Sequence, residues 1–140
     1  MVQEKASAST KNTSLAHGVG RRKKSVARVW CRSGNGSVRV NNLDIAQYFD
    51  TLIDVQNAET PLHVIPTSSS YDMKVTVSGG GKAAQADAVK LAIARCFVQL
   101  DAASKPALRA KGLLTVDARN KERKKPGQKA ARRKFQFTKR

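Results

Sequence analysis

The sequence predicts an α+β fold in which a small, mostly antiparallel sheet of about four strands carries two main helices on one face. Two stretches, residues 25–32 and 71–78, alternate apolar and polar side chains as half-buried strands do. A third stretch, residues 83–101, repeats its apolar side chains at helical spacing instead. At 140 residues the chain is long enough for one domain of ordinary size, so we expect a single core.

The first predicted strand covers residues 25–32. Alternation places three apolar side chains on one of its faces: Ala27, Val29 and Cys31. The turn signal Gly34-Asn35-Gly36 follows this strand. Residues 37–40 are therefore expected to return beside it as the second strand of a hairpin.

Two short helices are predicted next, at residues 44–49 and 51–60. The second is expected to stop before Pro61, because proline interrupts the hydrogen bonds of a helix interior. Residues 63–65 are then predicted to form a brief strand.

Residues 71–78 form the next predicted strand, and the glycine run 79–81 ends it. The longest helix, at residues 83–101, should turn one apolar stripe toward the core: Val89, Ile93, Cys96 and Leu100. A second main helix is expected to begin near Ser104 and to end near Gly112.

The charge is concentrated at the C-terminus. Residues 119–140 hold 11 basic side chains and one acidic residue, Glu122, within a chain of formal net charge +17. This stretch lacks apolar periodicity and contains the helix-breaking pair Pro126-Gly127, so we expect an extended tail. At ~3.3 Å per residue it could reach roughly 70 Å, far beyond a folded body spanning residues 17–118.

Residues 1–16 are expected to be a flexible extension, because they are rich in Ser, Thr and Ala without apolar periodicity. A strongly cationic chain usually has a polyanionic partner, with nucleic acid the first candidate and an acidic membrane surface the second. A transmembrane span would need about 20 consecutive apolar residues, and the sequence has no such run.

A second basic cluster, Arg21-Arg22-Lys23-Lys24, is followed by Arg28 and Arg32 at strand spacing. Gly18 and Gly20 precede it and would let the backbone approach a partner closely. Six basic residues within 12 positions, with no acidic residue among them, favour contact with phosphates over a merely solvated face.

Other chemistries have weaker signals. The residues 79–84 fit a dinucleotide-binding glycine pattern, but the helical pattern runs on to Asp101 and leaves no room for the required second strand. We interpret the glycines as a tight turn whose free N–H groups could hold an RNA phosphate.

Four side chains could ligate a metal but lack paired spacing, so no metal site or cofactor is expected: His17, Cys31, His63 and Cys96. The two cysteines are expected to be buried, reduced thiols.

At this point the chain resembles the bacterial-type small-subunit ribosomal protein nine family. Gly18-Val19-Gly20-Arg21-Arg22-Lys23 is similar to the opening motif of that family, and Val77-Ser78-Gly79-Gly80-Gly81 to its strand-to-helix segment. Residues 113–119 and 122–125 match the family's approach to the tail, and residues 129–140 its terminal signature. Three motifs in the right order cover about residues 18–140.

The resemblance implies a fold shared with the second domain of ribosomal protein five, and no catalytic activity. It also implies docking on ribosomal RNA in the head of the small subunit, beside neighbouring ribosomal proteins, with the tail reaching the anticodon loop of transfer RNA in the peptidyl site. The residues expected to contact ribosomal RNA are all basic: Arg21, Arg22, Lys23, Lys24, Arg28, Lys82, Arg119, Arg123, Lys124, Lys125, Lys129, Arg132, Arg133 and Lys134. Lys139 and Arg140 are expected to contact the transfer RNA.

We therefore expect a structural protein of a cytoplasmic ribosome, with an organellar ribosome left open. No membrane and no small-molecule substrate are expected. Two alternatives remain at this stage. One is a free nucleic-acid-binding protein, which would tolerate a scrambled tail. The other is an enzyme, which would need a concave pocket with convergent titratable groups.

Overall fold

The computed structural model describes residues 14–139. Five strands form one sheet in the order β1-β2-β5-β3-β4. Their bounds are Ala16–Arg22 for β1, Ser25–Ser33 for β2, Val38–Val40 for β3, Leu43–Asp44 for β4 and Tyr71–Ser78 for β5. Every pairing is antiparallel except that of β3 with β5, so the predicted mostly antiparallel α+β sheet is confirmed.

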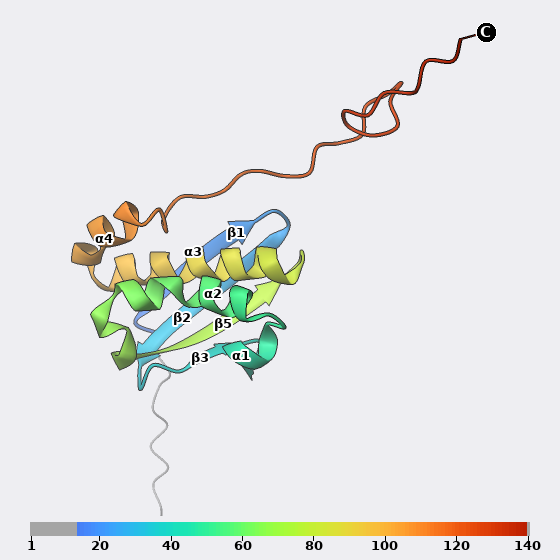
Figure 1. Ribbon diagram of the computed structural model, residues 1–140. Coiled ribbons are helices and arrows are strands. Elements are labelled where there is room, and N and C mark those ends of the chain that lie inside the picture. The colour runs from blue at the N-terminus through green and yellow to red at the C-terminus, as the bar shows by residue number, and fades with distance from the viewer. Residues whose placement is uncertain (1–13, 140) are drawn as a thin grey trace, which may run out of the picture.

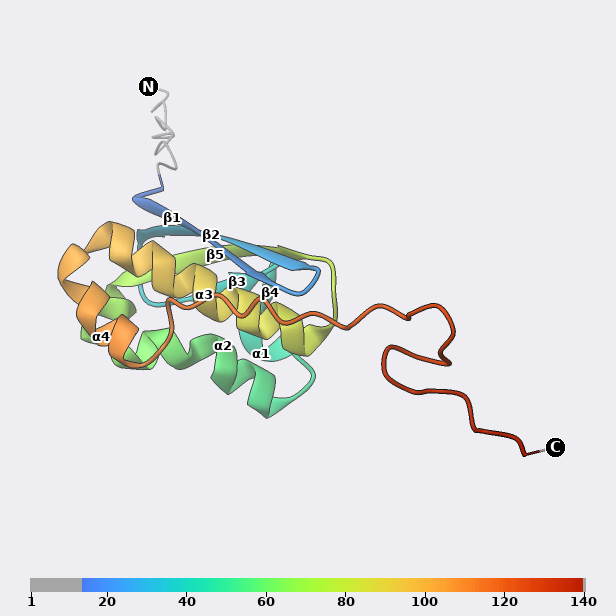
Figure 2. The ribbon, with the colours of Figure 1, turned by 90° about the horizontal axis from the view of Figure 1, so that it is seen from above.

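The helices lie on one side of this sheet (Figures 1 and 2). Their bounds are Ile45–Tyr48 for α1, Leu52–Val64 for α2, Lys82–Leu100 for α3 and Lys105–Ala110 for α4, with short 3₁₀ helices at Pro66–Ser70 and Ala102–Ser104. Helix α3 packs across β1 and β2, and α2 packs beside α3. Among residues 14–139, no helix is long and apolar enough to cross a membrane.

The core forms where the alternating strands meet the apolar stripe of α3. The apolar faces predicted for β2 and β5 are buried, except that Tyr71 at the start of β5 is only partly buried, and Val89, Ile93 and Cys96 of the helix are buried as predicted. Leu100, predicted on the same stripe, is only partly buried where the helix ends. Burying a Val or Ile side chain contributes about 1.5–3 kcal/mol, so this contact accounts for much of the driving force for folding.

Two strands of the sheet were not predicted, the two-residue β4 and the longer β1. Strand β1 contains Gly18 and Gly20, which reduce its strand signal because glycine lacks a side chain to pack. The structure explains them, since a Cβ at Gly20 would lie 2.6 Å from the Ala92 nitrogen and would overlap the Ala88 carbonyl oxygen. The partner that these glycines approach closely is therefore helix α3.

The predicted hairpin of residues 25–32 with 37–40 is wrong. Strand β5 lies between β2 and β3, and it pairs with β2 over eight positions. The side chain of Asp72 at the start of β5 accepts hydrogen bonds from the backbone N–H groups of Asn35 and Ser37, both at 2.9 Å. These bonds hold the loop after β2 across the beginning of β5. Strand β3, which follows the loop, then runs along the edge of β5 that faces away from β2.

The predicted end of the second short helix is also wrong, and so is the strand at residues 63–65. Helix α2 begins after Thr51, whose hydroxyl accepts a hydrogen bond from the Asp54 N–H, and runs through Pro61 to Val64. Pro61 and Ala58 are fully buried on one face of this helix. Packing against the core thus outweighs the usual effect of proline in a helix interior.

Candidate nucleic-acid interface

The face of the sheet that the helices leave uncovered is strongly basic. Because side chains alternate along strands, the residues opposite to the core point to this face. Five of them are cationic and come from four strands: Arg21, Arg28, Arg32, Arg39 and Lys74. We call these residues, together with His17 and Trp30, the open sheet face.

One row of the open sheet face runs straight across four strands. His17 lies opposite Trp30, Trp30 opposite Lys74, and Lys74 opposite Arg39. The His17 and Trp30 rings are 5.2 Å apart between centroids and tilted by 45°. A row that combines aromatic rings with cations suits nucleic acid, since rings stack on bases or sugars while cations meet phosphates.

Sequence reasoning found part of this face and missed part. Arg21 and Arg28 were predicted RNA contacts and both are exposed. Arg39 and Lys74 were missed because they come from strands that join only through the parallel pairing of β3 with β5. The one available signal was the position of Lys74 between the apolar residues Met73 and Val75, which places it on the outer face.

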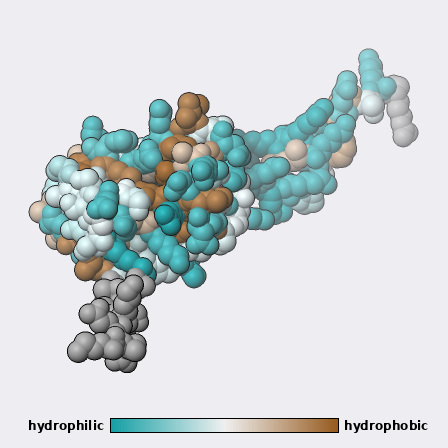
Figure 3. Space-filling view, turned by 90° about the horizontal axis from the view of Figure 1, so that it is seen from below, coloured by the Kyte–Doolittle hydropathy of each residue, from teal (hydrophilic) through white to brown (hydrophobic). Residues whose placement is uncertain are grey.

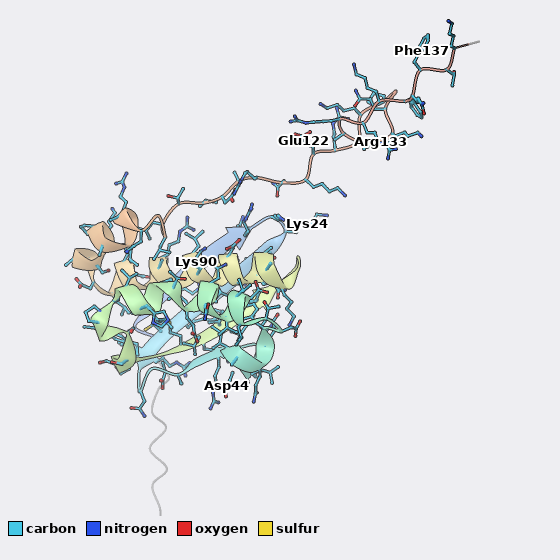
Figure 4. All side chains as sticks on the ribbon, in the orientation of Figure 1. Lys24, Asp44, Lys90, Glu122, Arg133 and Phe137 are labelled. Carbon is cyan, nitrogen blue, oxygen red and sulfur yellow. The ribbon has the colours of Figure 1, made fainter. Side chains whose placement is uncertain are left out.

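The β1–β2 turn presents two more predicted contacts, Lys23 and Lys24, to solvent. Figure 4 shows Lys24 at this turn. Lys23 adopts a left-handed backbone conformation with φ of 52°, as a two-residue hairpin turn requires. Next to this turn, a hollow of about 550 Å³ is also lined by Gly80, Gly81 and residues 120–122. The turn and the beginning of the C-terminal segment thus share one surface.

Arg22 is bound within the protein. Its guanidinium lies 2.9 Å from an Asp117 carboxylate oxygen and 3.6 Å from one of Asp87, and it donates to the Arg119 carbonyl oxygen at 2.7 Å. Its side chain is only 13% exposed. Arg22 therefore joins β1, α3 and the start of the C-terminal segment, a role that the charge run in the sequence does not reveal.

The two carboxylates around Arg22 are held ionised. Hydrogen bonds from the Arg119 side chain and backbone, helped by the charges of Arg119 and Arg22, keep the pKa of Asp117 well below its usual range. Burial raises the pKa of Asp87, but hydrogen bonds from Asn57 and Lys90 and the nearby positive charges outweigh it, so that pKa is also lowered. The ion pairs of Arg22 with Asp87 and Asp117 therefore stay charged across the physiological pH range.

Lys82 is exposed, but its ammonium group also binds another part of the protein. Its Nζ donates to the Tyr48 carbonyl oxygen at 2.6 Å and lies 3.8 Å from the centroid of the Tyr48 ring. The Tyr48 hydroxyl in turn donates to the Gln85 side chain at 2.8 Å. Lys82 thus ties the end of α1 to the beginning of α3.

The C-terminal segment, residues 119–139, has no helix or strand and extends away from the body (Figures 1 and 2). All of its basic residues are exposed. Arg132 and Glu122 form an ion pair at 2.6 Å, and the hydrogen bonds from the Arg132 side chain lower the pKa of Glu122. In the same part of the chain, the Lys129 N–H donates to the Arg133 carbonyl oxygen at 2.9 Å, and these bonds together fold the segment into a loop.

Two exposed aromatic rings follow this loop. Phe135 is 61% exposed with the Lys129 ammonium 5.8 Å from its ring centroid, and Phe137 is 89% exposed. Large apolar rings left in solvent on an extended cationic segment are typical of segments that bind folded RNA. Of the two predicted transfer-RNA contacts, Lys139 is exposed and Arg140 lies outside the described residues.

The cysteines are buried, free thiols, as predicted. Burial raises the pKa of Cys31 and raises that of Cys96 to about 12. Within residues 14–139 no three His, Cys, Asp or Glu side chains gather as metal ligands would.

Comparison with known proteins identifies a family. The model of the family described as "Ribosomal protein S9/S16" matches residues 20–140. A protein of Bacteroides fragilis named "Small ribosomal subunit protein uS9" is 45% identical over 126 residues, which covers 90% of this chain and 98% of the relative. Proteins of the same name from Cytophaga hutchinsonii and Treponema pallidum are 47% and 49% identical with the same coverage.

Proposed function

The chain belongs to the ribosomal protein S9 family and is a structural, non-enzymatic protein of the small ribosomal subunit; from this premise we propose that its two cationic surfaces bind ribosomal RNA in the head of that subunit. The open sheet face docks the body, and the C-terminal segment is a tail that enters the RNA. Neighbouring ribosomal proteins are its other partners.

The observation that supports this proposal is that the basic residues divide between the rigid open sheet face and the extended tail. The open sheet face is fixed by seven β1–β2 and eight β2–β5 residue pairs, so its cations have a defined spacing. The arm is anchored at its root by Arg22, which accounts for the position of Arg119. A rigid open sheet face with a tail fixed at its beginning suits one folded RNA better than nucleic acid of arbitrary structure.

The predicted RNA contacts divide accordingly. Most remain accessible and are proposed to meet phosphates: Arg21, Lys23, Lys24, Arg28, Arg119, Arg123, Lys124, Lys125, Lys129, Arg132, Arg133 and Lys134. To these the structure adds Arg39 and Lys74. Arg22 and Lys82 are proposed to contribute by holding the tail and the start of α3 in place.

The end of the tail is proposed to contact transfer RNA in the peptidyl site. Lys139 and Arg140 belong to the stretch that the family model matches, and the fully extended tail is long compared with the body. Arginine engages a phosphate with two parallel hydrogen bonds, whereas lysine acts as a point charge.

Sedimentation tests the main proposal. The tagged chain should co-migrate with small ribosomal subunits after a high-salt wash. A chain with residues 121–140 in scrambled order is the matched control, because its charge is unchanged. A free nucleic-acid-binding protein would tolerate the scrambling, whereas a tail in register with folded RNA would not.

Truncation after Asn120 tests the tail separately, and it keeps the carbonyl of Arg119 that Arg22 needs. If the tail meets about six phosphates, each contributing about 0.7, the slope of log affinity against log salt should fall by roughly 4. Titration of both forms against ribosomal RNA at several salt concentrations measures this slope. An unchanged slope would exclude the tail as a phosphate binder.

A further inference from the structure

Three large hydrophobic side chains are exposed together at the corner formed by β4, α1 and the first turn of α2. Leu43 is 49% exposed, Leu52 79% and Ile53 78%. Helix α1 contacts both β4 and α2, so these elements form one continuous corner. Figure 3 views the molecule from the β3 and α1 side and shows hydrophobic surface there, whereas the C-terminal segment is mostly hydrophilic. We call Leu43, Leu52 and Ile53 the hydrophobic patch.

Folding does not require the patch to be apolar. Leu52 and Ile53 occupy the first two positions of α2, where the helix needs a cap rather than a packed side chain. Thr51 supplies that cap, and Asp54 adds a negative charge in the first turn. Neighbouring exposed hydrophobic residues without a role in the core are typical of a surface that another molecule covers.

The chain around the patch is acidic, and the two cations beside the corner lie away from Leu52 and Ile53 in the fold: Arg39 pairs opposite Asp44 of β4, and Lys82 contacts Tyr48 of α1. Residues 40–73 contain no lysine or arginine but five acidic residues, in a chain whose net charge is +17. Three of these acids flank the patch along the chain: Asp44, Asp50 and Asp54. Asp44 lies on the side of the molecule away from the C-terminal segment (Figure 4). Asp50 and Asp54, on either side of Leu52 and Ile53 in the chain, would repel phosphates and attract a basic polypeptide.

We propose that the hydrophobic patch docks a basic segment of a neighbouring protein, whose apolar side chains cover Leu52 and Ile53 while its Lys or Arg side chains meet Asp50 and Asp54. The open sheet face and the tail bind RNA, and this corner binds protein. The proposal rests on the proposed function only in that the neighbour belongs to the same particle. A second copy of the chain is the weaker candidate, because two bodies of this net charge repel each other.

Site-directed photo-crosslinking in purified small subunits tests the proposal. A photoreactive phenylalanine analogue replaces Leu52, and the control carries it at Thr76, an exposed position of β5 on the opposite face of the sheet. Position 52 should give one protein product whose cross-linked segment has a net positive charge, and position 76 should give ribosomal RNA. Cross-linking of position 52 to RNA, to an acidic segment, to a second copy, or to nothing would overturn the proposal.

Substitutions test the hydrophobic part of the surface. With the probe at Gln47, an exposed position of α1, the double variant Leu52→Ser and Ile53→Ser should lower the yield of the protein product about tenfold. Gln56→Ser, at an exposed polar position of the same helix, is the matched control and should leave the yield unchanged. An unchanged yield in the double variant would refute the role of the patch.

Two further measurements separate the causes of failure. An unchanged thermal midpoint of the double variant shows that α2 still folds. Incorporation of the chain into subunits is measured first, because its absence would refute the proposed function, whereas incorporation without a protein product at position 52 refutes only the docking proposal.

Discussion

The contact between β1 and α3 gives a sharp prediction for Gly20→Ala. Real Cβ atoms essentially never lie within 3.0 Å of another heavy atom, and a Cβ at Gly20 would lie 2.6 Å from the Ala92 nitrogen. The strand would have to move by at least about 0.4 Å, and by more to clear the Ala88 carbonyl oxygen. Both obstacles are backbone atoms of α3, so no side chain can rotate away.

The energetic consequence follows from the rigidity of both elements. Seven residue pairs hold β1 to β2, and α3 is packed over its whole length, so the shift strains the sheet or opens the core. Overpacking of this kind costs about 1–3 kcal/mol, and we expect the upper half of that range. A domain stable by about 5–15 kcal/mol should remain folded, with clearly reduced stability.

Equilibrium urea denaturation, followed by the fluorescence of the single tryptophan, Trp30, measures the change. The matched control is Gly81→Ala, because a Cβ there has no neighbour within 4 Å and the residue does not adopt a positive φ. The control should cost only about 0.5–1 kcal/mol, because Gly81 is the N-cap of α3 and Ala is a poorer N-cap residue than Gly. If Gly20→Ala is as stable as Gly81→Ala, the close approach of β1 to α3 is not real. Gly18→Ala should act through the same displacement, so the double variant should cost less than the sum.

Three other outcomes are expected. Asp117→Asn should speed tryptic cleavage after Arg119 several-fold. The pKa of Asp117 is lowered, so its ion pairs are complete above the ordinary Asp pKa of about 3.9 and are lost only at more acidic pH. Loss of these ion pairs should therefore cause no change in the cleavage of the unmodified protein between pH 5 and 8. Cys31 and Cys96 should resist Ellman's reagent at pH 8 in the folded protein, because both are buried and the pKa of Cys96 is raised to about 12, and both should react after unfolding in guanidinium; modification of the native protein at the unfolded rate would contradict this. Deleting Lys139 and Arg140 should leave subunit assembly intact and weaken transfer-RNA binding to the peptidyl site of isolated subunits by about 1–3 kcal/mol in filter binding, whereas equal affinity would exclude the proposed role of the tip.

The elements that could be predicted from the sequence are those with a side-chain pattern of their own. Alternation along β2 and β5 and the apolar stripe of α3 reflect faces that are buried in the structure, and each pattern is complete within one segment. The basic C-terminus was visible for the same reason, since its charge is consecutive in the chain. That the body shares its fold with the second domain of ribosomal protein five stays a prediction.

The predictions that proved wrong concern elements whose structure depends on residues of another segment of the chain. Strand β1 packs through glycine backbone, so its burial leaves no apolar pattern to detect. Helix α2 passes through Pro61 because the buried proline contacts the core, and this gain depends on residues far along the chain. The order of β3 and β5 depends on the bond of Asp72 to a loop 35 residues earlier.

The sequence by itself determined the class of the fold, the sign and position of the charge, and the family. Only the tertiary structure decided which cations face outward. Arg21 and Arg22 are neighbours in one charge run, yet strand alternation exposes the first and turns the second toward Asp87 and Asp117. Arg39 and Lys74 are 35 positions apart, yet parallel pairing places them side by side. The physical reason is that charge is a property of a residue, whereas availability to a partner depends on every neighbour that the fold brings to it.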